Sequence, residues 1–476
     1  MYHPGLLAAV LVISYMLAFA CIHRVLMSYR TAQGAAAWII SLLTMAPLAV
    51  PLFFLFGRSR FDGYVKARRL GNQAVNHLVE RFERQNAALS EPHRQPDTDE
   101  LMALTRLAKQ PFSTGNDCQL LRDGVATVDA LLEAMEQSQE YILLEFYIVR
   151  SDHVGDRIKQ VLKRKAAEGV RVYFLYDDIG SLFLSRGYMR EMRKAGVETA
   201  SFGDGDVRRH RLQINFRNHR KLLICDGRVG FVGGVNLGDE YLGTAMHHEP
   251  WRDTHCRIEG PAVVALQLAW TEDWHWATKA IPELNWSWSG PYPGELDVLS
   301  VATGPADDYD SGSLFFLNAI NSARDRLWIT TPYFVPDQQV VNALQLAALR
   351  GVDVRILIPE KSDSLLVTLA AYSYLIQASR SGISLYQYRQ GFMHQKVLLV
   401  DNRYAAIGTH NLDNRSMRLN FEIAAVIRNS AFAGEVERML EKDLENCHLL
   451  DAAHFYDRSL PFRLACRSAR LLAPLL

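Results

Sequence analysis

Two long apolar stretches open the chain and predict two membrane-spanning helices. Residues 5–22 carry no charged side chain, and residues 35–56 are strongly apolar. Because a hydrocarbon core of about 30 Å requires about 20 helical residues, both stretches are long enough to span a bilayer, at about 5–25 and 35–56. Pro47 and Pro51 predict a bend in the second helix, which a membrane helix tolerates.

Two other interpretations of this region are open in the sequence. The first stretch is compatible with a cleaved signal peptide, although its amino end has no basic residue and a second apolar stretch follows at once. A buried hairpin in a soluble core is the other interpretation. The succession of two such stretches favours a membrane hairpin over both.

Basic residues flank the two stretches and predict their orientation. They fall between the stretches and directly after the second one, at Arg24, Arg30, Arg58, Arg60, Lys66, Arg68 and Arg69. Positively charged segments remain on the cytoplasmic side of a membrane. We therefore expect the amino terminus and the large body that follows to be cytoplasmic.

The hydrophobic pattern beyond the hairpin predicts an α/β body built from an internal repeat. After a polar linker, 61–104, the order helix, apolar strand, helix, apolar strand occurs over 131–178 and again over 314–359, and Tyr147 matches Tyr333. Strands alternating with helices imply βαβ units in mixed, mainly parallel sheets sandwiched by helices. We expect two pseudo-symmetric lobes, 105–290 and 291–450, with a shared site at their junction.

The last segment, 451–476, is a candidate basic amphipathic tail. Residues 458–476 contain four Arg and no acidic residue, with Leu and Phe side chains between them. Such a segment suits a helix that lies at a membrane interface. A helix docked on the protein core fits the same pattern, and the sequence leaves both open.

Composition and charge narrow the function classes. Apolar residues make up 49% of the chain and charged residues 22%, which supports packed domains rather than disorder. Residues 1–60 hold four Arg and no acid, so the rest carries 48 basic against 52 acidic residues. A slightly acidic body argues against nucleic acid as a partner. The six Cys are scattered without a CxxC pair, which predicts neither a zinc site nor a disulfide framework and suits a reducing compartment.

The candidate chemistry lies in one motif that occurs twice, once in each half. The pattern H-x-K-x4-D-x6-G-[GT]-x-N begins at residue 219 and again at residue 394; its members are His219, Lys221, Asp226, Gly233 and Asn236, then His394, Lys396, Asp401, Gly408 and Asn411. The surrounding residues predict two strands joined by a tight turn. Since residues i and i+2 of a strand face the same side, the His and Lys of each motif project together. The glycines allow close approach of a backbone or a ligand.

These residue types suit phosphoryl transfer without a metal or a cofactor. One neutral imidazole attacks phosphorus, and the second protonates the leaving alkoxide and then deprotonates the incoming alcohol. The two lysines and two asparagines stabilise the phosphoryl oxygens. Asp253 and Glu422, on the strand after the motif in each half, are candidates to orient the imidazoles. Asp226 and Asp401 stand at the turns, where we expect them to shape the loop.

The doubled motif resembles that of the phospholipase D superfamily, over about residues 105–450. Within it the chain resembles bacterial cardiolipin synthases that begin with a membrane hairpin, through FGRSRFDGY, NFRNHRKLLICDG, WRDTH, TPYFVPD and NLDNRSMRLNFE. The resemblance implies that two phosphatidylglycerols give cardiolipin and glycerol through a phosphatidyl-histidine, at the inner membrane of a bacterial cell. It also implies that the His, Lys and Asp of both motifs form the catalytic site. His410 stands where members often have Ser or Ala.

Several alternatives share these residues. A phospholipase D or a phosphatidylserine-synthase-like transferase would use water, serine or ethanolamine as acceptor. A nuclease of the same superfamily fits poorly with the acidic body, and a catalytically dead lipid binder fits poorly with intact paired His and Lys. We take His219 as nucleophile and His394 as general acid and base, although the symmetry of the motifs permits the reverse. The sequence does not predict an oligomeric state.

Overall fold

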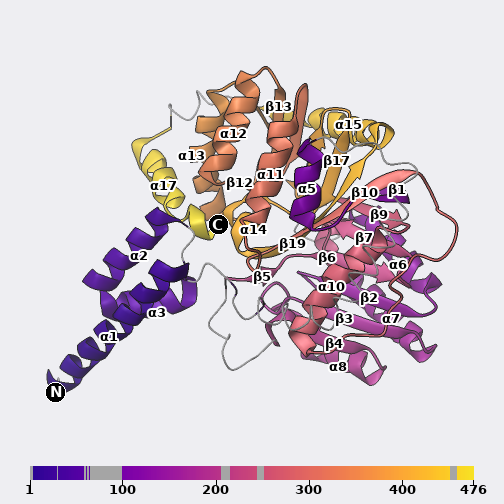
Figure 1. Ribbon diagram of the computed structural model, residues 1–476, viewed down its shortest axis with the longest axis horizontal. Helices are drawn as coiled ribbons and strands as arrows, with labels where there is room; N and C mark the ends of the chain where they lie inside the picture. The colour runs from indigo at the N-terminus through magenta and orange to yellow at the C-terminus, as the bar shows by residue number, and fades with distance from the viewer. Residues whose placement is uncertain are drawn as a thin grey trace.

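The computed structural model describes residues 4–28, 31–57, 61, 64, 99–204, 215–243, 251–450 and 458–476. Its amino-terminal helices project from the body as a separate hairpin (Figure 1). They are α1 (Pro4–Ser28), α2 (Ala32–Thr44) and α3 (Ala46–Phe56). In the described part of the chain, only α1 is long and apolar enough to cross a membrane alone, over Ala8–Met27.

The prediction of one continuous second helix over 35–56 was wrong. The apolar stretch forms two short helices that part at Met45, whose φ of −137° and ψ of 44° are not helical. Pro47 explains the break, because it has no N–H to donate to the carbonyl one turn earlier. The three helices pack together through small and apolar side chains, including Ala18, Ala49 and Phe53.

Of the basic residues that predicted the orientation, Arg24 lies inside α1 rather than in a loop. The others, Arg30, Arg58, Arg60, Lys66, Arg68 and Arg69, lie outside the described residues. Most of the expected linker also lies outside them. Its last part forms helix α5 (Asp99–Ala108), whose Leu101 and Leu104 are buried against the second lobe.

The body contains two halves of matching element order, as the repeat predicts (Figure 1). The first half contains β1 (Ser113–Arg122), α6 (Asp123–Gln137), β2 (Tyr141–Phe146), α7 (His153–Ala167), β3 (Arg171–Tyr176), α8 (Arg186–Lys194), β4 (Glu198–Ser201), β5 (Arg217–Asn218), β6 (Lys221–Cys225), β7 (Val229–Gly233), β8 (Trp251–Arg252), β9 (Thr254–Glu259) and α10 (Val263–Thr278), with short 3-10 turns η1 (Phe202–Asp204) and η2 (Asp239–Leu242).

The second half repeats this order with small changes. It contains β10 (Leu296–Thr303), α11 (Ser311–Ser322), β11 (Arg326–Thr330), β12 (Phe334–Val335), α12 (Gln338–Leu349), β13 (Asp353–Pro359), α13 (Leu365–Ser379), β14 (Ser384–Tyr388), β15 (Phe392–Met393), β16 (Val397–Val400), β17 (Tyr404–Gly408), β18 (Leu412–Asp413), α14 (Asn414–Arg418), β19 (Asn420–Arg428), α15 (Ser430–Leu444) and β20 (Cys447–Leu449), and is followed by α17 (Leu460–Arg470) and η3 (Ala473–Leu475).

One continuous sheet runs through both halves. Its order is β20-β14-β13-β11-β16-β17-β19-β10-β1-β9-β7-β6-β2-β3-β4, and the antiparallel pair of β1 with β10 joins the lobes. Along this path, parallel pairing occurs in the βαβ parts, where β2, β3 and β4 run together, as do β11, β13 and β14. The sheet is therefore mixed rather than mainly parallel, because the two motif hairpins insert antiparallel strands.

The carboxyl-terminal helix α17 is docked on the body, the second of the two interpretations of the tail. Its Cys466 and Ala469 are buried, and the carbonyl of Cys466 accepts a hydrogen bond of 3.2 Å from Ser373 Oγ of α13. Leu460 and Leu464 remain exposed on the other side of the helix. The helix thus keeps an apolar outer face while it packs on α13.

One disulfide corrects the expectation from the cysteine count. Cys118 of β1 and Cys256 of β9 are joined across adjacent strands. The two residues are 138 positions apart in sequence. No local spacing signals this pair, because it arises from strand pairing alone.

Candidate active site

Each motif histidine lies where a short strand of its own lobe meets a strand of the other lobe. In the first lobe, β5 pairs in parallel with β19, and the N–H of His219 donates to the carbonyl of Phe421 at 2.9 Å. In the second lobe, β15 pairs in parallel with β8, and the N–H of His394 donates to the carbonyl of Arg252 at 2.8 Å. The backbone therefore ties each histidine to the opposite half of the molecule.

This crossing pairs each imidazole with a carboxylate from the other lobe. His219 Nδ1 lies 2.8 Å from an oxygen of Glu422, and His394 Nδ1 lies 2.6 Å from an oxygen of Asp253. The sequence singled out both carboxylates, each on the strand after the motif of its own half, and the structure pairs each with the histidine of the other half. A carboxylate at Nδ1 holds a proton there and leaves the Nε2 lone pair free.

The carboxylates are themselves held in place. Glu422 also accepts hydrogen bonds from Ser416 Oγ at 2.7 Å and from Asn420 Nδ2 at 3.2 Å. Burial opposes its charge, but His219 and the neighbouring cations lower the pKa of Glu422 to about 2. Burial raises the pKa of Asp253 to about 6, against the opposing charge of Lys396. Both groups are carboxylates at neutral pH.

Both imidazoles are buried, and this keeps them neutral. Burial, opposed by Glu422 and aided by Lys221 and Lys396, lowers the pKa of His219 to about 4. The pKa of His394 lies well below its usual value for the same reason, with Lys396, Lys221 and His219 adding to the effect of burial. Because charges of each lobe act on the histidine of the other, the two motifs form one site.

The two lysines lie beside the histidines, as the strand period predicts. Lys221 Nζ donates to the carbonyl of His219 at 2.8 Å, and Lys396 Nζ lies 2.9 Å from His394 Nδ1. Burial lowers the pKa of Lys221 to about 7 and that of Lys396 to about 8. Two buried lysines next to two imidazoles make a centre suited to a phosphodiester.

Aromatic residues that the sequence reasoning did not assign to the site surround the imidazoles. The ring of Tyr147 lies 4.9 Å from that of His219, and the ring of Trp251 lies 4.9 Å from that of His394. Tyr241 OH lies 3.3 Å from His394 Nδ1. The match of Tyr147 with Tyr333 in the repeat was a signal for the first of these. Such rings exclude water from the imidazoles.

The two motif asparagines are buried and differ in their contacts. Asn236 Oδ1 accepts from the N–H of Ile148 at 3.1 Å, and its Nδ2 donates to Tyr241 OH at 2.7 Å. Asn411 Oδ1 has no hydrogen-bond partner among the described residues. Asn236 thus holds the Tyr241 hydroxyl next to His394, an indirect contribution that the motif alone did not indicate.

Asp226 and Asp401 do not reach the histidines, contrary to the site that the resemblance implied. The Asp226 carboxylate accepts N–H groups at the start of β2, including that of Tyr141 at 2.8 Å, and the Asp401 carboxylate does the same at the start of β11, including that of Arg326 at 3.0 Å. Strands β6 and β16 separate these carboxylates from the site. Both residues have φ near 55°, as a tight turn requires.

The motif glycines allow a neighbouring strand, rather than a ligand, to approach. A Cβ at Gly233 would lie 2.5 Å from the Cα of His255, and a Cβ at Gly408 would lie 2.4 Å from the carbonyl oxygen of Ile423. Any side chain there would push β9 or β19 away. Since Asp253 directly precedes β9 and Glu422 lies on β19, the glycines help to position the carboxylates.

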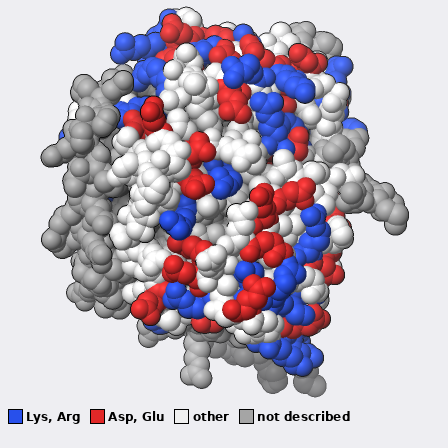
Figure 2. Space-filling model, turned by 90° about the vertical axis from the view of Figure 1, so that its right-hand side faces the viewer, with Lys and Arg blue, Asp and Glu red and all other residues white. Residues whose placement is uncertain are grey.

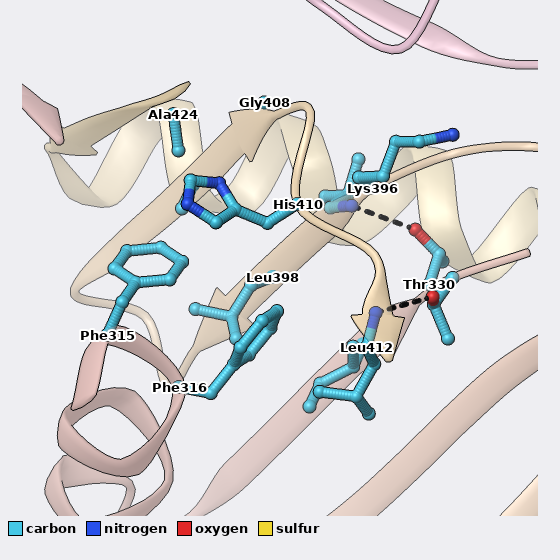
Figure 3. A pocket seen from close by; sticks show the side chains of 13 residues that line it. Phe315, Phe316, Thr330, Lys396, Leu398, Gly408, His410, Leu412 and Ala424 are labelled. Carbon is cyan, nitrogen blue, oxygen red and sulfur yellow. Dashed lines mark hydrogen bonds between the residues drawn. The ribbon is translucent and has the colours of Figure 1, made fainter. Parts of the chain in front are cut away.

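A small cavity lies behind the second motif (Figure 3). His410 points into it from the loop after β17, with its ring centroid 5.1 Å from that of Phe315 and its Nε2 2.8 Å from Thr303 Oγ1. Burial lowers the pKa of His410 to about 4. The cavity measures about 10 Å³, room for about one water molecule, and is too small for a lipid head group. His410 therefore packs the wall behind the site.

No group of three or more His, Cys, Asp or Glu side chains suited to a metal ion occurs among the residues that the structure describes. Each imidazole is bound through Nδ1 to a carboxylate. The arrangement offers two nucleophilic or basic nitrogens and two cations. These groups can carry out a metal-free displacement at phosphorus.

Comparison with known proteins shows which family has this fold and site. The model of the cardiolipin synthase PLD-like domain matches residues 131–253 and 316–444. The chain is 45% identical over 470 residues to cardiolipin synthase A of Pseudomonas aeruginosa strain LESB58, covering 96% of this chain and 93% of that protein. It is 42% identical over 479 residues to cardiolipin synthase A of Pseudomonas fluorescens strain SBW25, covering 100% and 99%.

A solved structure supports the fold independently. The phosphatidylserine synthase of Haemophilus influenzae Rd KW20 aligns with a TM-score of 0.63 at 14% identity, over 80% of this chain and 100% of that one. The fold and the site thus define a two-lobed enzyme of the phospholipase D class. Within that class, the chain belongs to the cardiolipin synthase family, which confirms the family, fold and enzyme class that the sequence predicts.

Proposed function

We propose that this cardiolipin synthase transfers a phosphatidyl group from one phosphatidylglycerol to another through a phosphatidyl-histidine. As a member of its family it is a phosphatidyltransferase of phospholipid biosynthesis. The observation that carries the proposed mechanism is the crossed pairing, in which each motif imidazole is bound through Nδ1 to a carboxylate of the other lobe. That pairing supports a neutral nucleophile and a separate proton carrier in one site.

In the first step, His219 Nε2 attacks phosphorus and the bond from phosphorus to the glycerol head group breaks. Protonated His394 gives its proton to the departing alkoxide, so glycerol leaves neutral. Lys221 and Lys396 stabilise the phosphoryl oxygens as their charge rises. The bound phosphodiester anion offsets the cations that lower the pKa of His394, and so favours the imidazolium that this step needs.

In the second step, neutral His394 takes the proton of a head-group hydroxyl of the second phosphatidylglycerol. The resulting alkoxide attacks phosphorus, the phosphorus–nitrogen bond breaks, and His219 is restored as cardiolipin forms. Trapping the covalent adduct and mapping it by mass spectrometry tests the assignment. An adduct on His394 would reverse the two roles.

A lipid-product assay tests the reaction. Full-length protein in mixed micelles with phosphatidylglycerol, without added metal, should form cardiolipin and glycerol. Addition of phosphatidylethanolamine or serine should leave cardiolipin the main product. Phosphatidic acid as the product would make water the acceptor, and a phosphatidylserine or phosphatidylethanolamine product would support the alternative transferase.

Membrane association follows from the family and from helix α1. We propose further that α1, α2 and α3 anchor the chain in the bacterial inner membrane, within the segment 1–60, and that the linker, the lobes 105–290 and 291–450 and the tail 451–476 are cytoplasmic. Protease digestion of spheroplasts and of inverted vesicles tests this topology; cleavage of the body in spheroplasts would contradict it.

The surface charge gives no support to nucleic acid as a partner. The face in Figure 2 shows basic and acidic side chains intermixed, without the continuous basic surface that suits nucleic acid.

A further inference from the structure

A basic groove with an apolar rim lies on the first lobe, outside the site described above. It has a volume of about 840 Å³ and lies between α8 and the loop after β3. Arg186, Arg190, Arg193 and Lys194 line it from α8, and Leu182 lines it from the loop. In Figure 1, α8 lies at the lower edge of the first lobe.

The charge in this groove is unbalanced. Arg186, Arg190 and Lys194 are exposed and make no ion pair with a described residue, and Arg193 donates only to the neutral hydroxyl of Thr199. The acidic residue that lines the groove, Asp178, is paired with Arg217 at 3.3 Å. The groove therefore presents free cationic groups to an anion.

The rim of the groove is apolar and is held in a defined shape. Leu182, which lines the groove, is 68% exposed, and Phe183, the next residue of the loop, is 79% exposed. Asp177 Oδ1 accepts the N–H groups of Ile179 and Gly180 at 3.0 and 2.9 Å. Ser181 Oγ donates to the carbonyl of Tyr147 at 3.0 Å. The loop keeps two large apolar side chains in solvent although its backbone is well bonded.

Hydrogen bonds and a ring contact connect this loop to the membrane hairpin and to the active site. Asn215 Nδ2 donates at 3.3 Å to the carbonyl of Phe56, the last residue of α3, and Arg217, two residues later, bonds Asp178 of the loop. On its other side the loop rests on Tyr147, whose ring contacts His219. The loop at the edge of the groove is thus linked both to the end of the hairpin and to the active site.

We propose that this groove and its rim form a bilayer contact, in which Leu182 and Phe183 enter the acyl region and the α8 cations bind the phosphate of an anionic phospholipid. The chemistry is that of an interfacial site, where apolar side chains enter the lipid and basic ones meet anionic head groups. The proposal rests on the placement of the hairpin in the membrane. It gives the first lobe a second attachment, which holds the mouth of the site at the lipid surface.

The test measures depth in the bilayer rather than turnover, so its failure is distinct from a failure of cardiolipin synthesis. The full chain carries Phe183→Cys in a Cys447→Ser background, because the other free cysteines, Cys21, Cys225 and Cys466, are buried. An environment-sensitive fluorophore at position 183 is followed in nanodiscs that contain doxyl-labelled phospholipid. The matched control is Leu349→Cys on α12, where the native side chain is 74% exposed.

We expect at least twofold quenching at position 183 in nanodiscs with phosphatidylglycerol, and none at position 349. Arg186→Gln with Arg190→Gln should weaken insertion of the loop into anionic discs by about tenfold in its equilibrium constant, measured as lost quenching at position 183. Arg438→Gln with Lys442→Gln, an exposed basic pair on α15, should leave it unchanged. Absence of quenching at 183 overturns the proposal, as does equal quenching in pure phosphatidylcholine, which would leave the cations without a role.

Discussion

At the residue scale, the carboxylates opposite the histidines decide whether the imidazoles can act. Glu422 touches no reacting atom in the proposed mechanism; it orients His219 through Nδ1 at 2.8 Å. The same relation holds for Asp253 and His394. Their contribution is therefore to the tautomer and direction of each ring.

We predict that Glu422→Gln lowers kcat by about 10²- to 10⁴-fold with little change in KM, because an amide does not hold the His219 tautomer as a carboxylate does. Product formation from phosphatidylglycerol measures this. Glu259→Gln, on β9 and paired with Arg257, is the control and should retain activity. A circular dichroism spectrum equal to that of the wild type excludes unfolding. Near-normal turnover of Glu422→Gln would contradict the positioning role.

The pH dependence of kcat/KM follows from the same groups. Asp253, with a pKa raised to about 6, gains a proton below that pH. It then no longer pairs as a carboxylate with His394 Nδ1, so activity should fall on the acid side. Lys221 and Lys396, with pKa values lowered to about 7 and about 8, lose their charge above those values, so activity should fall on the alkaline side. The profile should be bell-shaped with a maximum between these limits.

The comparison of kcat with kcat/KM checks the cause of the alkaline limb. A bound phosphodiester anion favours the charged ammonium, which raises the lysine pKa values in the complex. The alkaline limb of kcat should therefore lie at higher pH than that of kcat/KM. Coincident limbs would show that the lysines do not face the substrate.

At the element scale, the two motif hairpins depend on their turn aspartates. Asp226 binds three backbone N–H groups, those of Gln139, Glu140 and Tyr141, and so ties the end of β6 to the start of β2. Asp401 does the same for β16 and β11. These bonds stabilise β6, which begins at Lys221, and β16, which directly follows Lys396. Their position shows why the residues of one motif need not all touch the substrate.

We predict that Asp226→Ala lowers the free energy of unfolding by about 1–3 kcal/mol, because three backbone N–H groups lose their charged acceptor. Thermal unfolding measures the loss, and turnover per folded molecule should remain near that of the wild type. Asp226→Asn keeps one acceptor oxygen and should be affected less. A large loss of kcat in fully folded Asp226→Asn would show that Asp226 takes part in catalysis.

The membrane hairpin also belongs to this scale. Hydropathy predicted its apolar character, and the proline chemistry predicted a bend at the second helix. The bend is a complete break at Met45, since Pro47 removes one backbone donor and the two short helices each find packing against α1. Local sequence indicates where a helix weakens; tertiary contacts decide whether it parts.

At the scale of the whole molecule, the crossed pairing makes the lobes inseparable. Each imidazole depends on a strand of the other lobe, and β1 pairs with β10 to join the sheets. A single lobe therefore holds one histidine without its carboxylate. The complete site exists only when both halves of one chain fold together.

We predict that His219→Ala and His394→Ala each abolish turnover without unfolding the protein, and that mixing the two purified variants restores none. The reason is that the crossed contacts form within one chain. The cardiolipin assay on the mixture measures this, with diluted wild type in the same detergent as the control. Restored activity would mean that lobes of different chains exchange and build the site together.

The sequence by itself determined the family, the two-lobed α/β body and the two carboxylate candidates. It also determined that the His and Lys of each motif project to the same side of their strand. These follow from hydrophobic period, repetition and strand alternation, which are local properties. Only the tertiary structure decided that Glu422 serves His219 and Asp253 serves His394, that Cys118 meets Cys256, and that the tail docks on α13. Those outcomes depend on which distant strands and helices pair, and no spacing along the chain encodes that choice.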